Sequence, residues 1–509
     1  MSGVIISGDR RISFDQVMAR ARQAAAAMAS AGIRENDAVA CLLRNDFCFF
    51  EAAIGAGLLG AYFVPVNWHS KVGEVEYVLN DCGAKLLIAH ADLARTMNFA
   101  DPSWRTIEAG TPPEIAAAYS VAAGDVRPRT EPSWDEWIAP CAPWDRPPPS
   151  TRLNMIYTSG TTGRPKGVRR MPADPDQAAR MFGLVAKAFG LNMGGQMRTV
   201  VTGPVYHSAP NMYALSAVQS GGLVVLQSRF DAEELLALIE QHRITHLHMV
   251  PTMFVRLLKM PAEVRARYDV SSLRFVVHAA APCPAGIKRQ MVEWWGPIIH
   301  EYYGGTETGG VVFHGSGEAL DKPGTVGRAF DGCWIRILDA QGQEVPTGKP
   351  GEIYLRNNNF PDFTYHGMPE ERRKIERDGY VTLGDIGYLD ADGYLFLLDR
   401  AKDMIISGGV NIYPAEIEAV LVQMPGVKDC AVFGIPDAEY GEQICAVVEP
   451  HAGTQLNEQS VKDFLRQHLA GFKTPKVVEF SSALPREDSG KIFKRLLRDA
   501  YWAREGRLI

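Results

Sequence analysis

The sequence has few cysteines, and their spacing fits neither a metal site nor a disulfide framework. The eight cysteines in 509 residues are scattered, with no Cys-x-x-Cys pair and no histidines clustered around them. A zinc site and a small fold held together by disulfides are therefore both disfavoured. Free cysteines at this low density favour a reduced, cytoplasmic compartment.

The sequence also lacks a targeting segment and a long hydrophobic run. The N-terminus has no basic region followed by an apolar core, so it does not resemble a signal peptide. The longest apolar run, Ala52 to Val66, is interrupted by glycines and is shorter than the ~20 residues that a membrane-spanning helix needs. We expect no transmembrane segment, and we predict that this run is a buried helix leading into a strand.

Basic charge is not in excess. The chain has 53 Lys and Arg against 59 Asp and Glu, a formal net charge of −6, which disfavours a nucleic-acid-binding protein. A local basic patch for an anionic ligand stays open. The hydrophobic content of 46% and charged content of 22% are typical of soluble globular proteins. A chain of this length is too long for a single core, so we expect two or more domains.

Helical and strand-like patterns alternate over roughly the first 300 residues. The alanine-rich segment Phe14 to Ala31 predicts a helix, and the apolar segments Ala38 to Leu43 and Lys85 to Ala89 predict strands. This alternation favours a layered α/β architecture with largely parallel sheets. Further strands are predicted at Leu223–Leu226, Thr245–Val250 and Arg274–Val277.

Two later changes of pattern divide the rest of the chain. From Gly324 to Asp399, glycine turns separate short strands, which predicts a small antiparallel or barrel-like unit. After Arg400, helical and strand patterns mix, as in an α+β domain. We therefore predict a large N-terminal domain, residues 1–399, and a small C-terminal domain, residues 400–509.

The segment Tyr157 to Gly167, with the sequence YTSGTTGRPKG, is the clearest functional signal. Glycines let backbone N–H groups turn toward an anion, hydroxyls add donors, and Lys166 adds positive charge, so the segment predicts a polyphosphate site. The run Leu153 to Tyr157 before it predicts a strand. The segment is not a Walker A loop, because Pro165 stands five residues after Gly160 and a glycine follows the lysine. No Gly-x-Gly-x-x-Gly follows an early strand either.

Six further segments each allow an ordinary structural interpretation when they are taken singly. A glycine turn after a strand, a run of small residues or a charged surface turn would explain most of them. They are Val276–Pro282, Glu301–Glu307, Leu383–Gly387, Asp399–Asp403, Ser407–Glu418 and Pro485–Arg495.

Together the seven segments resemble the signature motifs of the adenylate-forming superfamily, which includes acyl-CoA synthetases, luciferases and the adenylation domains of peptide synthetases. They occur in the order of that family, so the resemblance covers essentially the whole chain. It implies a two-step reaction in which a carboxylate attacks the α-phosphate of Mg·ATP and a thiol then displaces AMP from the acyl-adenylate. It also implies Mg²⁺, ATP and coenzyme A as cofactor and co-substrates.

The resemblance implies a role for individual residues in nucleotide binding. Tyr303 would stack on adenine, Asp385 would bind the ribose hydroxyls, and Arg400 would reach the ribose and phosphate. Glu307, with Thr161, would hold Mg²⁺. The implied ATP and AMP site comprises Thr158, Ser159, Gly160, Thr161, Thr162, Gly163, Lys166, Ala280, Ala281, Pro282, Tyr302, Tyr303, Gly304, Gly305, Thr306, Asp385, Arg400 and Lys491.

The resemblance also implies the catalytic and moving parts. Lys491 would bridge the acid carboxylate and the α-phosphate, which lowers the repulsion between them as the bond forms. Lys402 would be the hinge that makes the small C-terminal domain mobile between the two half-reactions, and Gly408 and Gly409 would let the pantetheine arm of CoA pass close to the backbone. The implied catalytic set is Lys491, Glu307, His207 and Thr306.

The implied acid site disfavours an amino acid. His207 stands where amino-acid-adenylating members place an aspartate for the substrate ammonium, and it resembles the aromatic gate of acyl- and aryl-CoA ligases. The implied pocket is apolar, mostly small and without fixed charge, which suits a fatty, alicyclic or aryl acid better than a dicarboxylate. It comprises His207, Ser208, Ala209, Met212, Met253, Phe254, Ala279, Ala280, Gly305, Gly310, Val311 and Val312.

Three alternatives stay open. An acyl-AMP ligase would load a carrier protein instead of CoA, a luciferase-like oxygenase would oxidise the adenylate, and a regulator would bind nucleotide without catalysis. Intact Glu307 and Lys491 disfavour the regulator. The expected partners are a small carboxylic acid, ATP and CoA, without nucleic acid, and a homodimer is allowed for.

Overall fold

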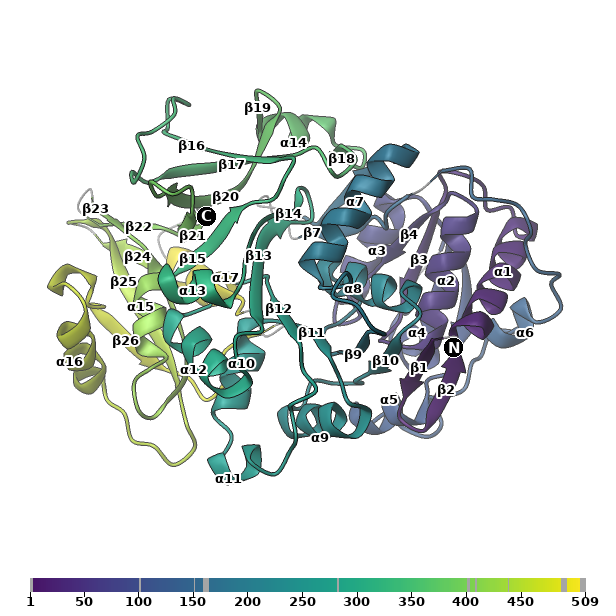
Figure 1. Ribbon diagram of the computed structural model, residues 1–509, viewed down its shortest axis with the longest axis horizontal. Helices are drawn as coiled ribbons and strands as arrows, with labels where there is room; N and C mark the ends of the chain where they lie inside the picture. The colour runs from purple at the N-terminus through teal and green to yellow at the C-terminus, as the bar shows by residue number, and fades with distance from the viewer. Residues whose placement is uncertain are drawn as a thin grey trace.

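The structure is a computed structural model that describes residues 3–99, 102–150, 152–158, 164–281, 283–400, 403–407, 410–437, 439–486 and 492–503. Figure 1 shows a large α/β part, with a smaller part formed by the last elements of the chain against one side of it. The predicted fold class, a large layered α/β domain followed by a smaller α+β domain, is confirmed. The boundary between residues 399 and 400 and the mobility of the smaller domain stay predictions.

Helices cover the sheets of both parts. No helix among the described residues is long and apolar enough to cross a membrane. The helices are α1 (Phe14–Ser30), α2 (Phe47–Leu58), α3 (Val72–Asp81), α4 (Ala91–Thr96), α5 (Pro113–Ala118), α6 (Trp134–Ile138), α7 (Pro175–Ala188), α8 (Ser208–Gln219), α9 (Ala232–His242), α10 (Pro251–Leu258), α11 (Ala262–Arg265), α12 (Ala285–Trp295), α13 (Ser316–Asp321), α14 (Pro369–Lys374), α15 (Pro414–Leu421), α16 (Glu458–His468) and α17 (Lys494–Trp502).

A four-stranded parallel sheet with the order β4-β3-β5-β6 forms the first layer of the N-terminal part. Its strands are β3 (Ala38–Leu42), β4 (Tyr62–Pro65), β5 (Ala84–His90) and β6 (Arg105–Ala109). The strands predicted at residues 38–43 and 85–89 are therefore confirmed. The apolar run from residue 52 to 66 is the end of α2 followed by β4, as predicted.

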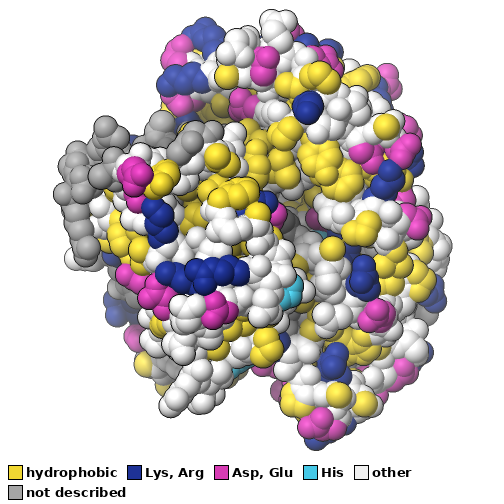
Figure 2. Space-filling model, turned by 90° about the vertical axis from the view of Figure 1, so that its left-hand side faces the viewer, with side chains coloured by type: hydrophobic (Ala, Val, Ile, Leu, Met, Phe, Trp, Pro, Cys, Tyr) yellow, Lys and Arg dark blue, Asp and Glu magenta, His cyan; other side chains and the backbone are white. Residues whose placement is uncertain are grey.

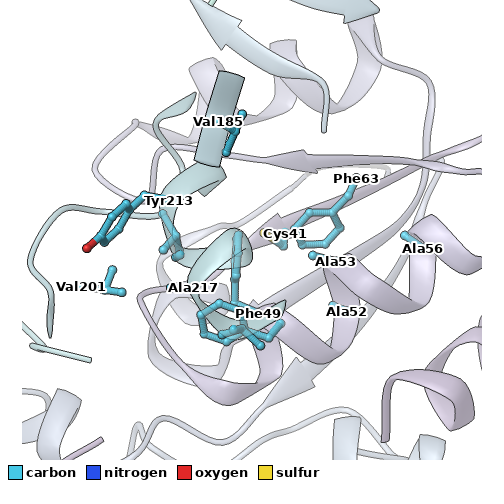
Figure 3. Packing of buried hydrophobic residues seen from close by; sticks show 14 of the residues in the cluster. Cys41, Phe49, Ala52, Ala53, Ala56, Phe63, Val185, Val201, Tyr213 and Ala217 are labelled. Carbon is cyan, nitrogen blue, oxygen red and sulfur yellow. The ribbon is translucent and has the colours of Figure 1, made fainter. Parts of the chain in front are cut away.

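Helices α1 and α2 pack closely on this sheet because one of them carries a glycine at the crossing. A Cβ added at Gly55 would lie 2.9 Å from the carbonyl oxygen of Ala21, so any larger residue would push the helices apart. Figure 3 shows Phe49 of α2 in the same buried cluster as Cys41 and Phe63 of the sheet. The alanine-rich sequence of α1 thus serves close packing as well as helix formation.

The larger sheet has a parallel half and an antiparallel half that meet at β13. Its order is β16-β17-β20-β21-β15-β14-β13-β12-β11-β9-β10-β1-β2, with β19 paired to β20. Adjacent strands from β1 through β10, β9, β11 and β12 to β13 are parallel to one another, and β13 is antiparallel to β14. The parallel half comprises β1 (Val4–Ser7), β9 (Arg198–Val201), β10 (Leu223–Leu226), β11 (His246–Met249), β12 (Phe275–His278) and β13 (Ile299–Gly305), with β2 (Arg10–Ser13) antiparallel at its edge.

The region from residue 324 to 399 was predicted to be antiparallel, which is confirmed, but it is not a separate unit. It continues the large sheet through the β13–β14 hairpin, and β16 and β17 fold back toward β14 and β15. The continuity of the sheet could not be predicted from the sequence, because hydrogen bonds between strands leave no pattern in the local sequence. The antiparallel strands are β14 (Gly309–His314), which precedes this region, and then β15 (Thr325–Ala329), β16 (Cys333–Leu338), β17 (Gly351–Asn357), β19 (Glu376–Arg377), β20 (Tyr380–Leu389) and β21 (Leu395–Arg400).

Two smaller sheets complete the fold. One, with the order β18-β8-β7, joins the ends of the Tyr157–Gly167 segment to a distant strand; the strand predicted at residues 153–157 is shorter and later, at Ile156–Thr158. The other is the C-terminal sheet, β23-β22-β25-β24, with β26 paired to β25. The strands are β7 (Ile156–Thr158), β8 (Lys166–Arg170), β18 (Phe363–Tyr365), β22 (Ile405–Ser407), β23 (Val410–Ile412), β24 (Val427–Asp437), β25 (Gly441–Pro450) and β26 (Val477–Phe480).

The two faces of the large sheet carry different helices. Residues of α7 and α8 pack with β9 and β12 on one face, and Figure 3 shows Tyr213 and Ala217 of α8 near Val201. Residues of α9, α10 and α12 pack on the other face. Because side chains alternate along a strand, successive residues of β13 belong to different faces.

A buried ionic cluster lies behind β13. The Glu301 carboxylate is ion-paired with Lys288 of α12, and its Oε2 lies 2.9 Å from His314 Nε2 of β14. Burial by itself would raise the pKa of Glu301, but the Lys288 charge lowers it to about 2. The cluster therefore holds α12, β13 and β14 together only while Lys288 and Glu301 are both charged.

Replacing Lys288 with methionine should lower the free energy of unfolding at pH 7 by about 3 kcal/mol, because it leaves the Glu301 charge buried without its partner. Urea denaturation measures this difference. Since the folded-state pKa of Glu301 lies below its ordinary value, the stability that it contributes is present above about pH 4.5 and is lost as the pH falls toward about 2.

The matched control is the double variant Lys288→Met/Glu301→Gln. Removing both charges should restore part of the lost stability, so the two changes should be less than additive. Full additivity would contradict the charge-pair interpretation.

Candidate active site

The Tyr157–Gly167 segment is a β-hairpin whose two ends are described. Thr158 ends β7, Lys166 begins β8, and these two residues are paired across the antiparallel strands. Several of the predicted site residues lie outside the described residues, so their roles stay predictions. They are Ser159, Gly160, Thr161, Thr162, Gly163, Pro282, Lys402, Gly408, Gly409 and Lys491.

Glu307 lies directly beside this hairpin. The Thr158 hydroxyl donates to Glu307 Oε1 at 3.3 Å, and the Tyr365 hydroxyl donates to the same oxygen at 3.0 Å. Burial, with the nearby carboxylate, raises the pKa of Tyr365, so this phenol stays a hydrogen-bond donor at neutral pH. The predicted phosphate segment and the predicted Mg²⁺ ligand are thus brought together across 149 residues of sequence.

Lys166 is paired within the protein. Its ammonium contacts the Glu371 carboxylate of α14 and lies 5.3 Å from the centre of the Tyr365 ring. A phosphate at this hairpin would therefore have to share Lys166 with Glu371. Neither Glu371 nor Tyr365 belongs to a segment that the sequence singled out.

The residues predicted to hold adenosine also converge. The Tyr303 hydroxyl donates to Asp385 Oδ2 at 2.7 Å, and Arg400 Nε lies 3.4 Å from Asp385 Oδ1. The three residues come from β13, β20 and β21, and Asp385 and Arg400 are directly paired in the ladder. Burial raises the pKa of Tyr303 well above its usual value, and Asp385 adds to this effect.

Tyr302 does not join this group. Its hydroxyl instead lies 2.9 Å from His248 Nε2 of β11, on the face of the sheet that α7 and α8 cover. The role of Tyr302 in the nucleotide site stays a prediction, and its side chain does not contact the Tyr303–Asp385 group, because alternation along β13 turns adjacent residues to opposite faces.

The hairpin after Tyr303 depends on glycine. A Cβ added at Gly304 would lie 1.9 Å from the carbonyl oxygen of Gly309, which no side chain could occupy. The register of the hairpin shifts between Tyr303 and Gly304. This bulge carries the chain toward Thr306 and Glu307 at the turn.

Thr306 faces the start of α8. Its hydroxyl donates to the Ser208 hydroxyl at 3.0 Å, and Ser208 is the first residue of the helix. The free N–H groups and the dipole at a helix N-terminus favour an anion. His207 is the N-cap residue, and its ring lies 4.4 Å from the ring of Tyr206. The predicted gate residue is thus next to the predicted α-phosphate contact.

The structure divides the predicted acid-site residues into two groups. Ser208, Ala209 and Met212 are partly exposed on α8, and Gly310 is partly exposed on β14. Phe254, by contrast, is fully buried on the other face of the large sheet. Including Phe254 in the pocket is therefore wrong, because the sheet separates it from α8.

The remaining predicted residues differ in exposure. Val311, Val312 and Met253 are buried in the hydrophobic clusters. Ala279 is buried at the end of β12, whereas Ala280 is exposed, with φ of 73°. A non-glycine residue in this left-handed conformation is strained, and such strain is typical of functional sites.

Arg170 is a buried residue that sequence reasoning missed. Its guanidinium donates to the carbonyl oxygens of Thr306 at 2.8 Å, Glu307 at 2.7 Å and Pro361 at 2.6 Å. Burial lowers its pKa to about 10, which still leaves it charged at pH 7. It holds the backbone of the turn that presents Thr306 and Glu307. Its place three residues after Gly167 was the one local hint.

Comparison with known families agrees with this geometry. A family model described as AMP-binding enzyme matches residues 3–360, and one described as AMP-binding enzyme C-terminal domain matches residues 416–491. The chain belongs to the AMP-binding enzyme family. The two matched ranges correspond to the large and small parts of the fold, so this AMP-binding enzyme has both parts of the architecture.

Relatives with stated activities match this AMP-binding enzyme over nearly their whole length. A feruloyl-CoA synthase from an Amycolatopsis species is 34% identical, covering 96% of this chain and 94% of the relative. The ATP-bound structure of MatB from Rhodopseudomonas palustris has a TM-score of 0.81 with 28% identity, over 98% and 96% of the two chains. An anthranilate CoA ligase, AuaEII, in complex with anthranoyl-AMP has a TM-score of 0.84 with 25% identity, over 99% and 95%.

Replacing Arg170 with lysine should lower kcat/KM for acid-dependent pyrophosphate release by about 10- to 100-fold. A lysine cannot donate to three carbonyl oxygens in the same plane, so the turn that carries Thr306 and Glu307 should shift. Steady-state kinetics measures the change. The control is Arg169→Lys on the preceding residue, whose guanidinium lies over Tyr62. Equal losses in both variants would contradict a specific role for Arg170.

Proposed function

We propose that this protein is an ATP-dependent acyl-CoA synthetase that converts a carboxylic acid to its acyl-CoA through an acyl-adenylate. The observation that carries the proposal is the convergence of Thr158, Thr306 and Glu307 beside Tyr303 and Asp385 on the β13–β14 hairpin and its neighbours. Relatives named as CoA ligases, including the feruloyl-CoA synthase, support an acid–thiol ligase.

In the first half-reaction, a carboxylate oxygen of the acid attacks the α-phosphorus of ATP, and the bond from that phosphorus to the pyrophosphate oxygen breaks. Thr306 and the N-terminal N–H groups of α8 are placed to stabilise the charge on the α-phosphate. Tyr303 and Asp385 are proposed to hold the adenosine. Lys491 is proposed to bridge the two anions as they approach.

In the second half-reaction, the sulfur of CoA attacks the acyl carbonyl carbon, and the bond from that carbon to the AMP oxygen breaks. AMP then leaves, and the thiol proton passes to solvent. Gly408 and Gly409 are proposed to flank the pantetheine arm, and Lys402 is proposed as the hinge by which the two half-reactions use the same face. Figure 2 shows a hollow in the side of the molecule where the C-terminal elements lie.

Mg²⁺ fits the donor set beside the phosphate segment. Mg²⁺ prefers oxygen ligands and commonly takes one or two carboxylates together with phosphate oxygens and water. The Glu307 carboxylate, next to the Thr158 hydroxyl, is such a donor, and Thr161 is the second proposed ligand. The ion would neutralise phosphate charge during adenylate formation.

A hydrophobic acid without a second charge, aryl or fatty, is the substrate class that these observations support. The partly exposed side chains along α8, Ala209 and Met212, are apolar and uncharged, and no arginine or lysine is among the predicted acid-site residues. The similar feruloyl-CoA synthase and anthranilate CoA ligase bear the names of aryl acids.

A panel of acids tests the proposed function. Pyrophosphate release should require ATP, Mg²⁺ and an acid that the enzyme accepts. The rate of AMP release should rise when CoA is added. The panel should include benzoates, cinnamates, arylacetates and fatty acids from C2 to C18, each with and without CoA. Pyrophosphate release without CoA-dependent turnover would point to a carrier-protein thiol instead. No release with any acid would overturn the proposal.

Replacing Lys491 with alanine should slow adenylate formation by about 1000-fold, because the charge bridge across the reacting groups is lost. Thioester formation from a supplied acyl-adenylate should change by less than about tenfold, since that step does not need the bridge. Single-turnover assays separate the two steps. The exposed Lys349 gives the control variant Lys349→Ala, which should leave both steps unchanged. Equal effects on both steps would contradict the assignment.

A further inference from the structure

A polar pair, formed by the buried His248 and the partly buried Tyr302, lies at the acid side of the site, outside the roles described above. The Tyr302 hydroxyl and His248 Nε2 are hydrogen-bonded at 2.9 Å, and His248 is only 4% exposed. Burial lowers the pKa of His248 to about 4, and burial raises the pKa of Tyr302, so both groups are neutral at pH 7. Burying such polar groups is costly unless they are paired.

The position of the pair follows from the sheet. His248 lies on β11 and Tyr302 on β13, with β12 between them, and His248 is paired with Val277 of β12. Neighbouring strands lie about 4.8 Å apart, so the Tyr302 ring must extend across β12 to reach His248. Because Val277 is paired with His300, the Tyr302 side chain crosses β12 obliquely to reach the level of His248.

Aromatic rings close the space between this level of the sheet and the helices. The Phe189 ring centre lies 6.0 Å from that of Tyr302, and the Tyr213 ring centre lies 5.3 Å from that of His248. Tyr213 itself is fully buried on α8, where Figure 3 shows it beside Val201. These rings therefore pack between α8 and the sheet at this level.

The position of the acid's carboxylate fixes the other end of the acid site. The carboxylate must lie near Ser208 and Thr306, whose hydroxyls are 3.0 Å apart at the start of α8. Along α8, Ser208, Ala209 and Met212 are partly exposed before the buried Tyr213, and Leu215 is partly exposed beyond it. Four residues of helix advance about 6 Å, so the part of α8 from Ser208 to Met212, before Tyr213, is about one turn long.

Gly310 of β14 lies at the edge of the proposed acid site, beside the accessible part of α8. A Cβ added at Gly310 would lie 3.4 Å from Tyr302 Cδ2, so the Tyr302 ring lies directly over one of the predicted acid-site residues. Tyr302 is thus at once a wall of the acid site and a partner of the buried histidine.

We propose that the Tyr302–His248 pair is the end wall of the acid site and restricts the enzyme to compact, single-ring acids with a hydroxyl or carbonyl group opposite the carboxylate. This inference rests on the proposed function, because it places the acid between α8 and the β13–β14 hairpin. After its bond to His248, the Tyr302 oxygen still has hydrogen-bonding capacity for a neutral substituent. A second carboxylate is excluded because a charge buried against a neutral pair is unstable.

The test compares acids that differ only in the group at the far end. The pairs are 4-hydroxybenzoate with benzoate and 4-hydroxycinnamate with cinnamate, and hexanoate with dodecanoate serves for length. The readout is kcat/KM for pyrophosphate release by the full-length protein. We expect the hydroxylated acid of at least one pair to be favoured about tenfold, as one hydrogen bond allows, and dodecanoate to be at least about 100-fold poorer than hexanoate.

Two variants assign these preferences to Tyr302. Tyr302→Phe should lower kcat/KM for the hydroxylated acid about tenfold more than for the parent acid, which abolishes the preference. Tyr302→Gly should raise kcat/KM for dodecanoate at least tenfold, because it removes the ring that closes the site. The control is Tyr268→Phe, which removes a surface phenol bonded to Glu233 and should change neither preference.

The outcomes separate this inference from the proposed function. Wild-type protein that uses dodecanoate as well as hexanoate, or that shows no preference within either aromatic pair, would overturn the inference while leaving acid activation intact. A Tyr302→Phe variant whose kcat/KM falls equally for both members of a pair would also overturn the inference and leave acid activation intact. Failure of every acid in the panel to release pyrophosphate would overturn the proposed function itself.

Discussion

The active site depends on the alternation of side chains along one strand, β13. Glu301 points into a buried ionic cluster with Lys288 and His314, Tyr302 points to the face covered by α7 and α8, and Tyr303 contacts Asp385. A one-residue change of register would exchange these surroundings. It would place a phenol against the Lys288 charge and a carboxylate beside the aromatic rings. The buried ion pair thus disfavours every register except the one that forms the site.

The turn after β13 is held by charge and by the absence of side chains. Gly304 allows the two strands of the hairpin to approach more closely than any Cβ would permit. Arg170 then holds the carbonyl oxygens of Thr306 and Glu307 from a neighbouring sheet. Because the guanidinium is buried, losing one of its acceptors would leave a donor unsatisfied, which makes the turn resistant to small displacements. Rigidity of this kind is what positioning of reacting groups requires.

Much of the fold and most of the candidate site could be predicted from local patterns. The helix α1, the strand β10 and the helix–strand succession around residue 60 follow from hydrophobic periodicity, which depends on neighbours in sequence. Tyr303, Asp385 and Glu307 stand in recognisable motifs, and the structure brings them next to one another or to other predicted residues. Arg170, Tyr365 and Glu371 could not be found in this way, because their importance comes from contacts with residues far away in the sequence.

The sequence by itself determined the chemistry that is available: a hydroxyl-rich glycine segment, a Tyr-Gly-Gly-Thr-Glu segment and a lysine near the C-terminus, in the order of the AMP-binding enzymes. These are properties of short segments, and composition and spacing record them. Only the tertiary structure decided that the adjacent residues Tyr302 and Tyr303 contact different partners, His248 and Asp385, and that Phe254 lies behind the sheet. The physical reason is that strand pairing, and not sequence distance, sets which face a side chain occupies and what it meets there.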